Sequence, residues 1–595
     1  MKRASIFKRD IPVGSRKPTA SPGIAQEVQG GVGDVFAVKD GDLFAWTYRG
    51  DPHYRLRPAG TGPAVLSEVL ARRFPSRLLA ARYEVVDLVG RSEELENLRD
   101  WAWKPAGTAV RVVYGMGGQG KTRLVARFAH DLSQVGWAVV EAHNRLAPLL
   151  GGATTAVDTA QSLDGAGLLI IVDYADRWPT PDLLAILDAH IGLPGPVRVL
   201  LVGRGLQGWW KSVEGALLDA GIDEVDEFRL SPLSDGLDRE GLDVQRAFRS
   251  AVAAFSPYLG LTESSLVSVP DYAPTPGSGD ALTLYMAALV VADATARGSE
   301  PPLNPAALST YLLDREREGW WQLANSGKIT SSPQQIGHVS VVAALTQALP
   351  YSAGIQAVQV AGIATSAPEA DQLLLDHKIT YPTTRPEMVL EALTPDRLAE
   401  DYIALTVPGA GPESDFSDPW TISALSHLLT PTQAWRDGSP ALPIYIRPAV
   451  TGLVEAASRW PHLLTQIIRP LLNRNPGLVL VGGGATVARL ATLAGTDANL
   501  LKLIDGQLPP RANLEFDEAA VVVAERRIAL ASNANTSTAE HATLLATVAY
   551  RYHNAGRRRE ALAPAQEAVD IYRVLADPES GNPAVYLPHL AGSLN

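Results

Sequence analysis

The chain contains no cysteine, which excludes disulfide bonds and any metal site built from thiolates. It also lacks an excess of basic charge, because 52 lysine and arginine residues stand against 64 aspartate and glutamate residues. The formal net charge is −12, so general adhesion to nucleic acid or anionic lipid is not expected and a nucleic-acid partner is unlikely on charge grounds alone. Eleven histidines are scattered without a pair at metal-ligand spacing, so no metal centre made by the protein alone is predicted.

Long apolar runs are missing too. The two longest apolar stretches, 281–296 and 477–488, are interrupted by Asp293 or are short and rich in glycine. Neither reaches the roughly 20 apolar residues that a spanning helix needs, so no membrane segment is predicted. Residues 1–23 carry charge but no apolar core, which excludes a signal peptide. Together with the absence of cysteine, this predicts a cytoplasmic protein.

At 595 residues the chain is too long for one core and predicts several domains. Residues 1–30 are polar and rich in proline, glycine and serine, which is typical of disorder. Residues 31–80 are predicted to form a small module with a hairpin at 35–48, where Asp40-Gly41 supplies the turn. The module contains no set of residues typical of a nuclease, protease or TIR active site. It is either an adaptor or oligomer contact for an effector or a structural appendage.

The segment 81–232 alternates between strand and helix patterns. Continuously apolar strands indicate a parallel sheet that is covered by helices on both faces. The predicted strands are 109–114, 137–142, 167–172 and 197–203, and the helices between them include 121–136 and 181–192.

After residue 232 the strand signal fades and helical spacing dominates. We predict a small helical domain at 233–305 and a winged-helix-like domain at 306–410 with a short β-like segment at 381–393. Residues 411–510 are predicted to be a helical linker or degenerate repeats.

A repeat pattern occupies 511–595. A 34-residue frame that starts at Ala542 places large, small and turn residues where the tetratricopeptide pattern has them. These residues are Leu545, Val548, Ala549, Tyr552, Gly556, Ala561 and Ala568. Single repeats cannot bury their own faces, so an α-solenoid array is expected, and it is expected to be truncated because the sequence stops within the next helix.

One short segment is unusually rich in glycine. Residues 115–122, GMGGQGKT, match G-x-x-x-x-G-K-[S/T], follow an apolar strand and open a helix. Glycines let successive N–H groups surround phosphate oxygens at a helix N-terminus. Lys121 is predicted to reach the β- and γ-phosphates of ATP, and the Thr122 hydroxyl to hold Mg²⁺. The nucleotide-binding residues predicted here are Gly115, Gly117, Gly118, Gln119, Gly120, Lys121, Thr122 and Arg123. A glycine-rich turn that meets the pattern by chance is the alternative.

Two aspartates follow the buried strand 167–172. Asp173 stands where a carboxylate holds Mg²⁺ with the nucleotide, although a strand-end aspartate can also cap a turn. Tyr174 takes the place of the glutamate that polarises water in fast motor ATPases, which favours slow turnover. Asp176 is the nearest substitute for that glutamate, or equally the N-cap of the next helix.

Arg204 lies just beyond the strand 197–203. An arginine at the carboxyl edge of an open α/β sheet is well placed to sense a γ-phosphate. The alternative is a solvated loop arginine. Upstream, Val89, Gly90 and Arg91 precede the helix that leads into the nucleotide domain.

These pieces in this order resemble the STAND class of signalling NTPases, the NB-ARC and NACHT relatives. LVGRSEEL at 88–95 resembles the motif that lies against adenine and ribose, which implies nucleotide contacts for Val89, Gly90 and Arg91. GMGGQGKTRL resembles the NB-ARC P-loop, LLIIVDYAD the Walker B strand and LLVGRG the sensor strand. FRLSPLSD at 228–235 is similar to the element that closes the nucleotide domain.

The sequence also departs from the family pattern. The G-x-P element is absent, with Pro276 displaced upstream of the helix in which it is expected. Asp376-His377 has the reverse order of the winged-helix Met-His-Asp motif, and the segment 393–404 occupies a plausible sensor position without a histidine. No nucleotide-sensing residue is therefore assigned in the winged helix.

The resemblance implies a switch in which ADP holds a closed form. Exchange for ATP, biased by a protein or stress ligand on the repeats, opens the protein and leads to a homo-oligomer that recruits an effector, as in bacterial anti-phage immunity or regulated cell death. Two alternatives are a transcriptional regulator of the same class, for which no basic DNA-binding domain is evident, and a tetratricopeptide scaffold with a vestigial nucleotide site.

Overall fold

The computed structural model describes most of the chain from residue 54 to residue 594. The residues that it does not describe within these limits are 61, 145–165, 191–192, 194, 223, 263–279, 303, 384, 412–414, 431–441, 533–536 and 580. The predictions of a disordered segment at 1–30 and of a hairpin at 35–48 lie outside the described residues.

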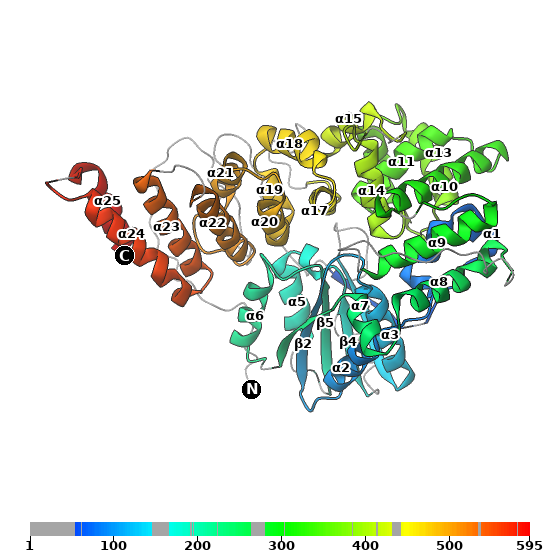
Figure 1. Cartoon of the computed structure of the whole chain (residues 1–595), viewed down its shortest axis with the longest axis horizontal. Coiled ribbons are helices and arrows are strands. Elements are labelled where there is room, and N and C mark those ends of the chain that lie inside the picture. The colour runs from blue at the N-terminus through cyan, green and yellow to red at the C-terminus, as the bar shows by residue number, and fades with distance from the viewer. Residues whose placement is uncertain are drawn as a thin grey trace.

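A six-stranded sheet forms the centre of the α/β domain (Figure 1). Its spatial order is β1-β3-β4-β5-β2-β6, and all neighbours are parallel except β1, which runs antiparallel to β3. Strand β5 therefore separates β2, which leads into the glycine loop, from β4, which ends before Asp173. The strands are β1 Tyr54–Pro58, β2 Thr108–Tyr114, β3 Trp137–Asn144, β4 Gly167–Val172, β5 Val197–Gly203 and β6 Val225–Arg229.

Helices cover both faces of this sheet, as continuously apolar strands require. On one face α2 (Ser92–Ala102) and α3 (Lys121–Gln134) pack against β2 through a core that includes Trp101, Val113 and Phe128. On the other face α5 (Thr180–His190) and α6 (Trp210–Asp219) cover Val112, Ile170 and Leu201. Every residue of β4 and β5 is buried, so the prediction of a doubly covered parallel sheet is confirmed for these strands.

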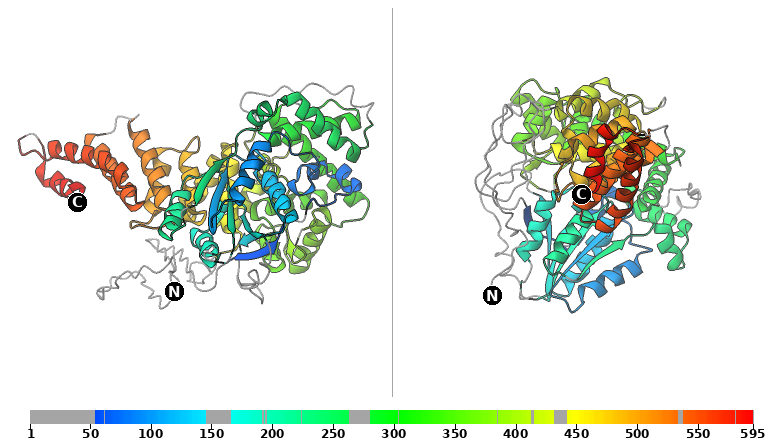
Figure 2. Two further views of the ribbon diagram at one scale, coloured as in Figure 1. Left: turned by 90° about the horizontal axis from the view of Figure 1, so that it is seen from below. Right: turned by 90° about the vertical axis from the view of Figure 1, so that its left-hand side faces the viewer.

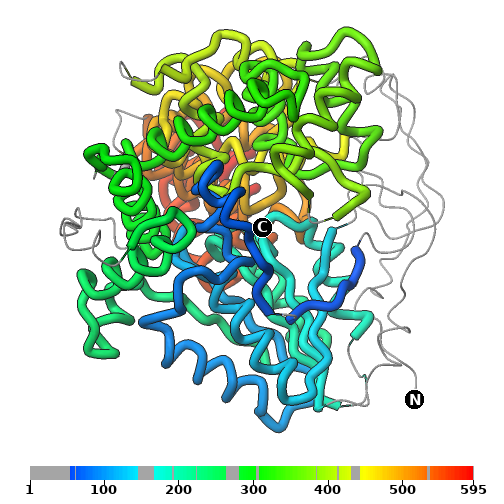
Figure 3. The backbone as a smooth tube through the Cα atoms, turned by 90° about the vertical axis from the view of Figure 1, so that its right-hand side faces the viewer, coloured from blue at the N-terminus to red at the C-terminus, as the bar shows by residue number. Residues whose placement is uncertain are grey.

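The edge strand β1 differs from the prediction of a separate module at 31–80. Tyr54–Pro58 pairs along Val140–Asn144 of β3, so the described part of this segment extends the nucleotide domain's sheet. The residues after it run between the sheet domain and the later helices (Figure 3). There α1 (Glu68–Arg73) packs on α8, the 3₁₀ helix η1 (Pro75–Leu79) on α9 and α10, and η2 (Ala81–Tyr83) on α3.

Helices dominate after β6, as the sequence predicts. The two-residue strands β7 (Leu349–Pro350) and β8 (Met388–Val389) form an antiparallel pair within the predicted winged-helix region. The elements from 233 to 410 are α7 Leu233–Arg239, α8 Val244–Leu259, α9 Ala281–Arg297, α10 Pro305–Asn325, α11 Pro333–Thr346, α12 Tyr351–Val360, α13 Ala367–Thr380 and α14 Asp396–Thr406.

The remaining helices continue the molecule away from this region, and the last ones project from the body (Figure 2). Successive helices α22, α23, α24 and α25 contact one another, and Gly556 makes the turn between α23 and α24 at a φ of 76°. The elements are α15 Pro419–Leu429, α17 Ile446–Ala457, the π-helical segment η5 Leu464–Ile468, α18 Arg469–Arg474, α19 Leu478–Val481, α20 Gly483–Thr492, α21 Ala498–Gln507, α22 Asp517–Ser532, α23 Thr538–Asn554, α24 Arg558–Leu575 and α25 Pro583–Leu594.

One continuous apolar cluster joins the helical parts. It begins at Leu66, passes through α8–α20 and reaches Val523 in α22. The helices from α8 to α22 therefore share one apolar core. Within the described residues, no helix combines the length and the apolar character that crossing a bilayer needs.

Candidate nucleotide-binding site

The glycine loop connects the buried centre of the sheet to α3. Gly118 and Gly120 adopt φ angles of 86° and 90°, in the left-handed region that favours glycine. A Cβ on Gly118 would lie 2.9 Å from Oδ1 of Asp280, and the Gly118 carbonyl accepts a hydrogen bond of 2.9 Å from the Leu282 N–H. The loop is therefore shaped by glycine and tied to the N-terminus of α9.

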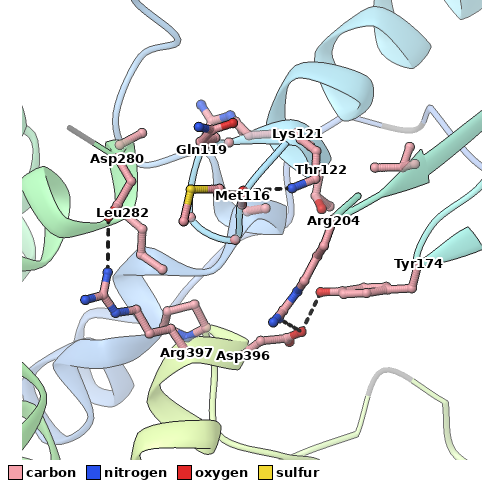
Figure 4. A pocket seen from close by; sticks show the side chains of 18 of the residues that line it. Met116, Gln119, Lys121, Thr122, Tyr174, Arg204, Asp280, Leu282, Asp396 and Arg397 are labelled. Atoms are coloured by element: carbon pink, nitrogen blue, oxygen red, sulfur yellow. Dashed lines mark hydrogen bonds and ion pairs between the residues drawn. The ribbon is translucent and has the colours of Figure 1, made fainter. Parts of the chain in front are cut away.

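Lys121 is buried at the first position of α3. Its Nζ donates hydrogen bonds to the carbonyls of Gly115 (2.5 Å) and Met116 (2.9 Å), so the ammonium lies within the curl of the loop (Figure 4). Burial and the nearby Arg204 guanidinium lower the pKa of Lys121 to about 8. The group is charged at neutral pH but can lose its proton under mildly alkaline conditions.

Thr122 and Asp173 meet across the loop. The Thr122 hydroxyl donates to Oδ2 of Asp173 at 3.1 Å, and the Tyr174 N–H donates to Oδ1 at 2.8 Å. Desolvation raises the pKa of Asp173. A hydroxyl and a carboxylate side by side beside a phosphate cradle are the oxygen ligands that Mg²⁺ takes together with nucleotide phosphates.

Asp176 lies in the 3₁₀ helix η3 (Ala175–Arg177) and is not the N-cap of α5, which corrects that alternative. Its Oδ2 accepts the backbone N–H of Arg204 at 3.0 Å, whereas its buried Oδ1 has no hydrogen-bond partner among the residues that the structure describes. Desolvation raises the pKa of Asp176. The carboxyl therefore fixes the backbone at the end of β5 and leaves one oxygen for a ligand or water.

Arg204 is not a solvated loop residue. Its side chain is 14% exposed and forms ion pairs with Glu400 (2.7 Å), Glu455 (3.0 Å) and Asp396 (3.6 Å). A Cβ on Gly117 would lie 3.7 Å from the guanidinium carbon, which places Arg204 against the glycine loop. Burial alone would lower the pKa of Arg204, but the carboxylates raise it well above its usual value.

The segment with Gly90 and Arg91 is attached to two neighbours. The Gly90 N–H donates to Oε2 of Glu240 at 2.8 Å, and its carbonyl lies 2.0 Å from the position of a Cβ on Gly236. Arg91 donates to the Gln119 carbonyl at 3.1 Å and pairs with Glu94 at 3.1 Å. Gly90 thus contacts α7, and Arg91 supports the glycine loop through its hydrogen bond to the Gln119 carbonyl.

Three other predicted residues have roles in shaping the site. Arg123 donates to the Val86 carbonyl at 2.6 Å and lies 3.6 Å from a carboxylate oxygen of Glu84, so it holds the segment before Val89 against α3. Val89 lines the cavity. The Gln119 side chain packs on Gly115, with Oε1 2.3 Å from where a Cβ of Gly115 would be.

No protein-family model matches the chain, and no curated protein does. Among solved structures the chain is similar to the Aeropyrum pernix ORC2 protein in its ADPNP and ADP complexes, at 15% identity and a TM-score of 0.28. That match covers 55% of this chain and 96% of the other. A Drosophila ORC bound to GC-rich DNA and Cdc6 is similar at 13% identity and a TM-score of 0.22, over 89% of this chain and 96% of that one. Such low scores say nothing about what this chain binds.

The sheet domain combines a largely parallel sheet with a glycine loop between β2 and α3 and a contact between Thr122 and Asp173. This arrangement is consistent with a P-loop NTPase fold, and we refer to this part of the chain as the P-loop NTPase domain. The P-loop NTPase domain opens into a cavity of about 720 Å³. The lining of the cavity combines apolar residues, among them Leu78, Leu79, Val86, Phe255 and Tyr285, with the glycine loop and charged groups.

Much of the cavity wall comes from helices far along the chain. Asp396, Arg397 and Glu400 of α14, Thr451 and Glu455 of α17, and Arg489 of α20 all line it. Sequence reasoning placed the segment 393–404 near the nucleotide but assigned none of its residues, and it missed α17 and α20. Among the described residues, no three histidine or acidic side chains gather as a metal site.

The lowered pKa of Lys121 predicts a pH dependence of nucleotide binding. Phosphate binding requires the ammonium form, which predominates at pH 7 and has fallen to about half at pH 8, so the dissociation constant should rise about twofold between pH 7 and 8. Above pH 8 binding must take up a proton, and the dissociation constant should rise by up to about tenfold per pH unit. Calorimetric titration with ADP and Mg²⁺ from pH 7.0 to 9.5 measures this profile. A constant affinity up to pH 9.5 would contradict the lowered pKa.

Proposed function

We propose that this chain is a switch of the STAND class that binds ADP or ATP with Mg²⁺. One observation carries the proposal: the cavity at the glycine loop is also lined by residues of α9, α14, α17 and α20, which belong to separate parts of the chain. A ligand in that cavity touches the contacts between these parts. Its binding free energy can therefore shift how they are arranged.

The residues fit a bound nucleotide. Gly118 and Gly120 leave the loop without side chains, Lys121 supplies a cation, and Thr122 with Asp173 supplies oxygen ligands for Mg²⁺. Gly115, Gly117 and Gln119 complete the loop. ADP and ATP differ by one phosphate group, and this difference distinguishes the two states of the proposed switch.

Slow hydrolysis suits this role. Tyr174 follows Asp173, and its hydroxyl donates to Oδ2 of Asp396 in α14 at 2.6 Å. This position therefore contacts α14 and has no carboxylate that could polarise a water molecule. Asp176 is the nearest carboxyl, and the residues proposed to act on the terminal phosphate are Asp173, Asp176 and Arg204. A long-lived ATP state follows from such a site, and a switch needs one.

The helices α17–α25 are proposed as the sensing arm. They extend from the cavity wall at Glu455 to the projecting end of the molecule (Figure 2), where Leu562 and Val574 are each 70% exposed. We propose that the helix pair α23–α24, with its turn at Gly556, is part of a tetratricopeptide-type solenoid that binds a protein or stress ligand. Oligomerisation, effector recruitment through the N-terminal region, and a role in bacterial immunity or cell death complete the proposal.

The nucleotide that leaves heat-denatured pure protein tests the proposal. Close to one ADP per chain, identified by chromatography, is the expected result for a resting switch. The second measurement is a calorimetric titration of nucleotide-free protein with ADP and Mg²⁺. If purified protein neither retains nor takes up adenine nucleotides, the chain is a helical scaffold and the proposal is wrong.

A further inference from the structure

Arg204 is held by carboxylates that come from two helices outside the P-loop NTPase domain. Its Nη2 donates to Oε1 of Glu400 in α14 at 2.7 Å, and its Nη1 donates to Oε2 of Glu455 in α17 at 3.0 Å. Glu400 and Glu455 side chains are only 8% and 14% exposed, so these are shielded, charge-assisted contacts. Both terminal nitrogens of the guanidinium are thereby engaged.

The carboxylates themselves are built into a network. Arg459 donates to the second oxygen of Glu400 at 2.9 Å and to Asp401 at 2.7 Å. Desolvation would raise the pKa of Glu400, but Arg204 and Arg459 together hold it below its usual value, so this carboxylate is ionised. The cluster is a fixed set of negative charges rather than a chance surface contact.

The same guanidinium also faces the phosphate end of the cavity. Arg204 lies against Gly117 of the glycine loop, and its charge lowers the pKa of Lys121. Figure 4 shows the Arg204 side chain extending from the loop region toward Asp396. One guanidinium therefore stands between two sets of acceptors, the phosphates of a nucleotide and the carboxylates of α14 and α17.

A triphosphate carries one more phosphate group than a diphosphate toward this end of the site. That group would compete with Glu400 and Glu455 for the Arg204 nitrogens and would bring like charges together in a shielded place. A diphosphate leaves the carboxylate contacts of Arg204 in place. The two ligands therefore differ in their interaction with this arrangement of helices.

We infer that Glu400 and Glu455 are specificity-determining residues, which make the arrangement seen here selective for a nucleoside diphosphate by occupying the guanidinium that a third phosphate would need. This inference rests on the proposed function, because it assumes a nucleotide at the glycine loop. It assigns the discrimination to two carboxylates outside the P-loop NTPase domain.

The test compares full-length wild type with Glu400→Gln, Glu455→Gln and the double variant. Glutamine keeps the shape of each side chain, and Asp401 still pairs with Arg459 when Glu400 is neutral. The dissociation constants of ADP and of a non-hydrolysable ATP analogue, each with Mg²⁺, are measured by calorimetry. We expect the double variant to bind the analogue about 10–100-fold more tightly while ADP affinity changes less than about threefold, a coupling of ordinary size.

Glu515→Gln is the matched control. Glu515 also joins the helical part to the P-loop NTPase domain, because it accepts the Thr180 N–H (2.8 Å) and pairs with Arg447 of α17 (2.7 Å), and among the described residues no hydrogen bond or ion pair joins it to Arg204. Its analogue-to-ADP affinity ratio should stay at the wild-type value. An unchanged ratio in the double variant, or an equal change in Glu515→Gln, would overturn the inference. Wild type that binds neither ligand would instead refute the proposed function.

Discussion

Replacing Lys121 with alanine is expected to weaken nucleotide binding by about 100-fold, the largest effect of any single substitution at the site. A hydrogen bond to a charged group contributes about 1.5–3 kcal/mol, and Lys121 is the lysine whose Nζ lies within the glycine loop. The substitution also removes the donor that joins the carbonyls of Gly115 and Met116, so the loop loses part of its internal support. Titration calorimetry with ADP and Mg²⁺ measures the loss.

Lys104→Ala is the control for this experiment, since Lys104 lies in the same domain and its ammonium pairs with Glu224 at the exposed surface. It should bind nucleotide as wild type does. Circular dichroism checks that Lys121→Ala is folded.

A switch should also lose nucleotide-dependent changes in hydrodynamic radius and assembly when Lys121 is replaced with alanine. A scaffold with a vestigial site would keep its assembly state whether or not Lys121 is present.

The glycine loop could be predicted from the sequence because its geometry is local. Strand, glycines, lysine and threonine follow one another within fifteen residues, so their order along the chain fixes how they lie in space. Asp173 could be placed for a similar reason, because an aspartate after a buried parallel strand must reach the same edge of the sheet as the loop. The four predicted strands were found through their runs of apolar residues, and of these β4 and β5 are buried along their whole length.

The partners of Arg204 could not be predicted in this way. Glu400 and Glu455 are 196 and 251 residues away along the chain, and each lies in a helix whose other faces pack in the core. Helical spacing shows that a glutamate lies on one face of its helix, but not what faces it. Only the packing of α14 and α17 over the sheet brings these carboxylates to the end of β5.

Two smaller differences have local causes. The edge strand Tyr54–Pro58 has the sequence YRLRP, in which charged residues and a proline give a weak strand signal. The strand is stabilised by its pairing with β3 rather than by the strand preference of its own residues. Asp176 is not the N-cap of α5, the alternative that its position before this helix suggested. Tyr174 adopts a left-handed φ of 53°, which turns the chain so that Asp176 reaches the Arg204 N–H instead of α5.

The close contact between the helical part and the P-loop NTPase domain predicts a second large effect. A Cβ on Gly484, at the start of α20, would lie 2.2 Å from the Gly208 carbonyl oxygen and 2.3 Å from that of Glu515. Both neighbours are backbone atoms and cannot turn aside, so Gly484→Ala should destabilise this contact by at least about 2 kcal/mol. Differential scanning calorimetry should show the P-loop NTPase domain unfolding earlier than in wild type.

Gly506→Ala separates this effect from a general response to alanine. Gly506 lies exposed in α21 of the same helical part, and nothing among the described residues lies within 4 Å of its Cβ position, so alanine there should stabilise the helix by about 0.5–1 kcal/mol.

Gly484→Ala should also raise the affinity for the ATP analogue relative to ADP, because α20 packs on α17 and a displacement of α20 moves Glu455 away from Arg204. Wild-type unfolding together with a wild-type affinity ratio in Gly484→Ala would show that this contact does not hold the two parts together.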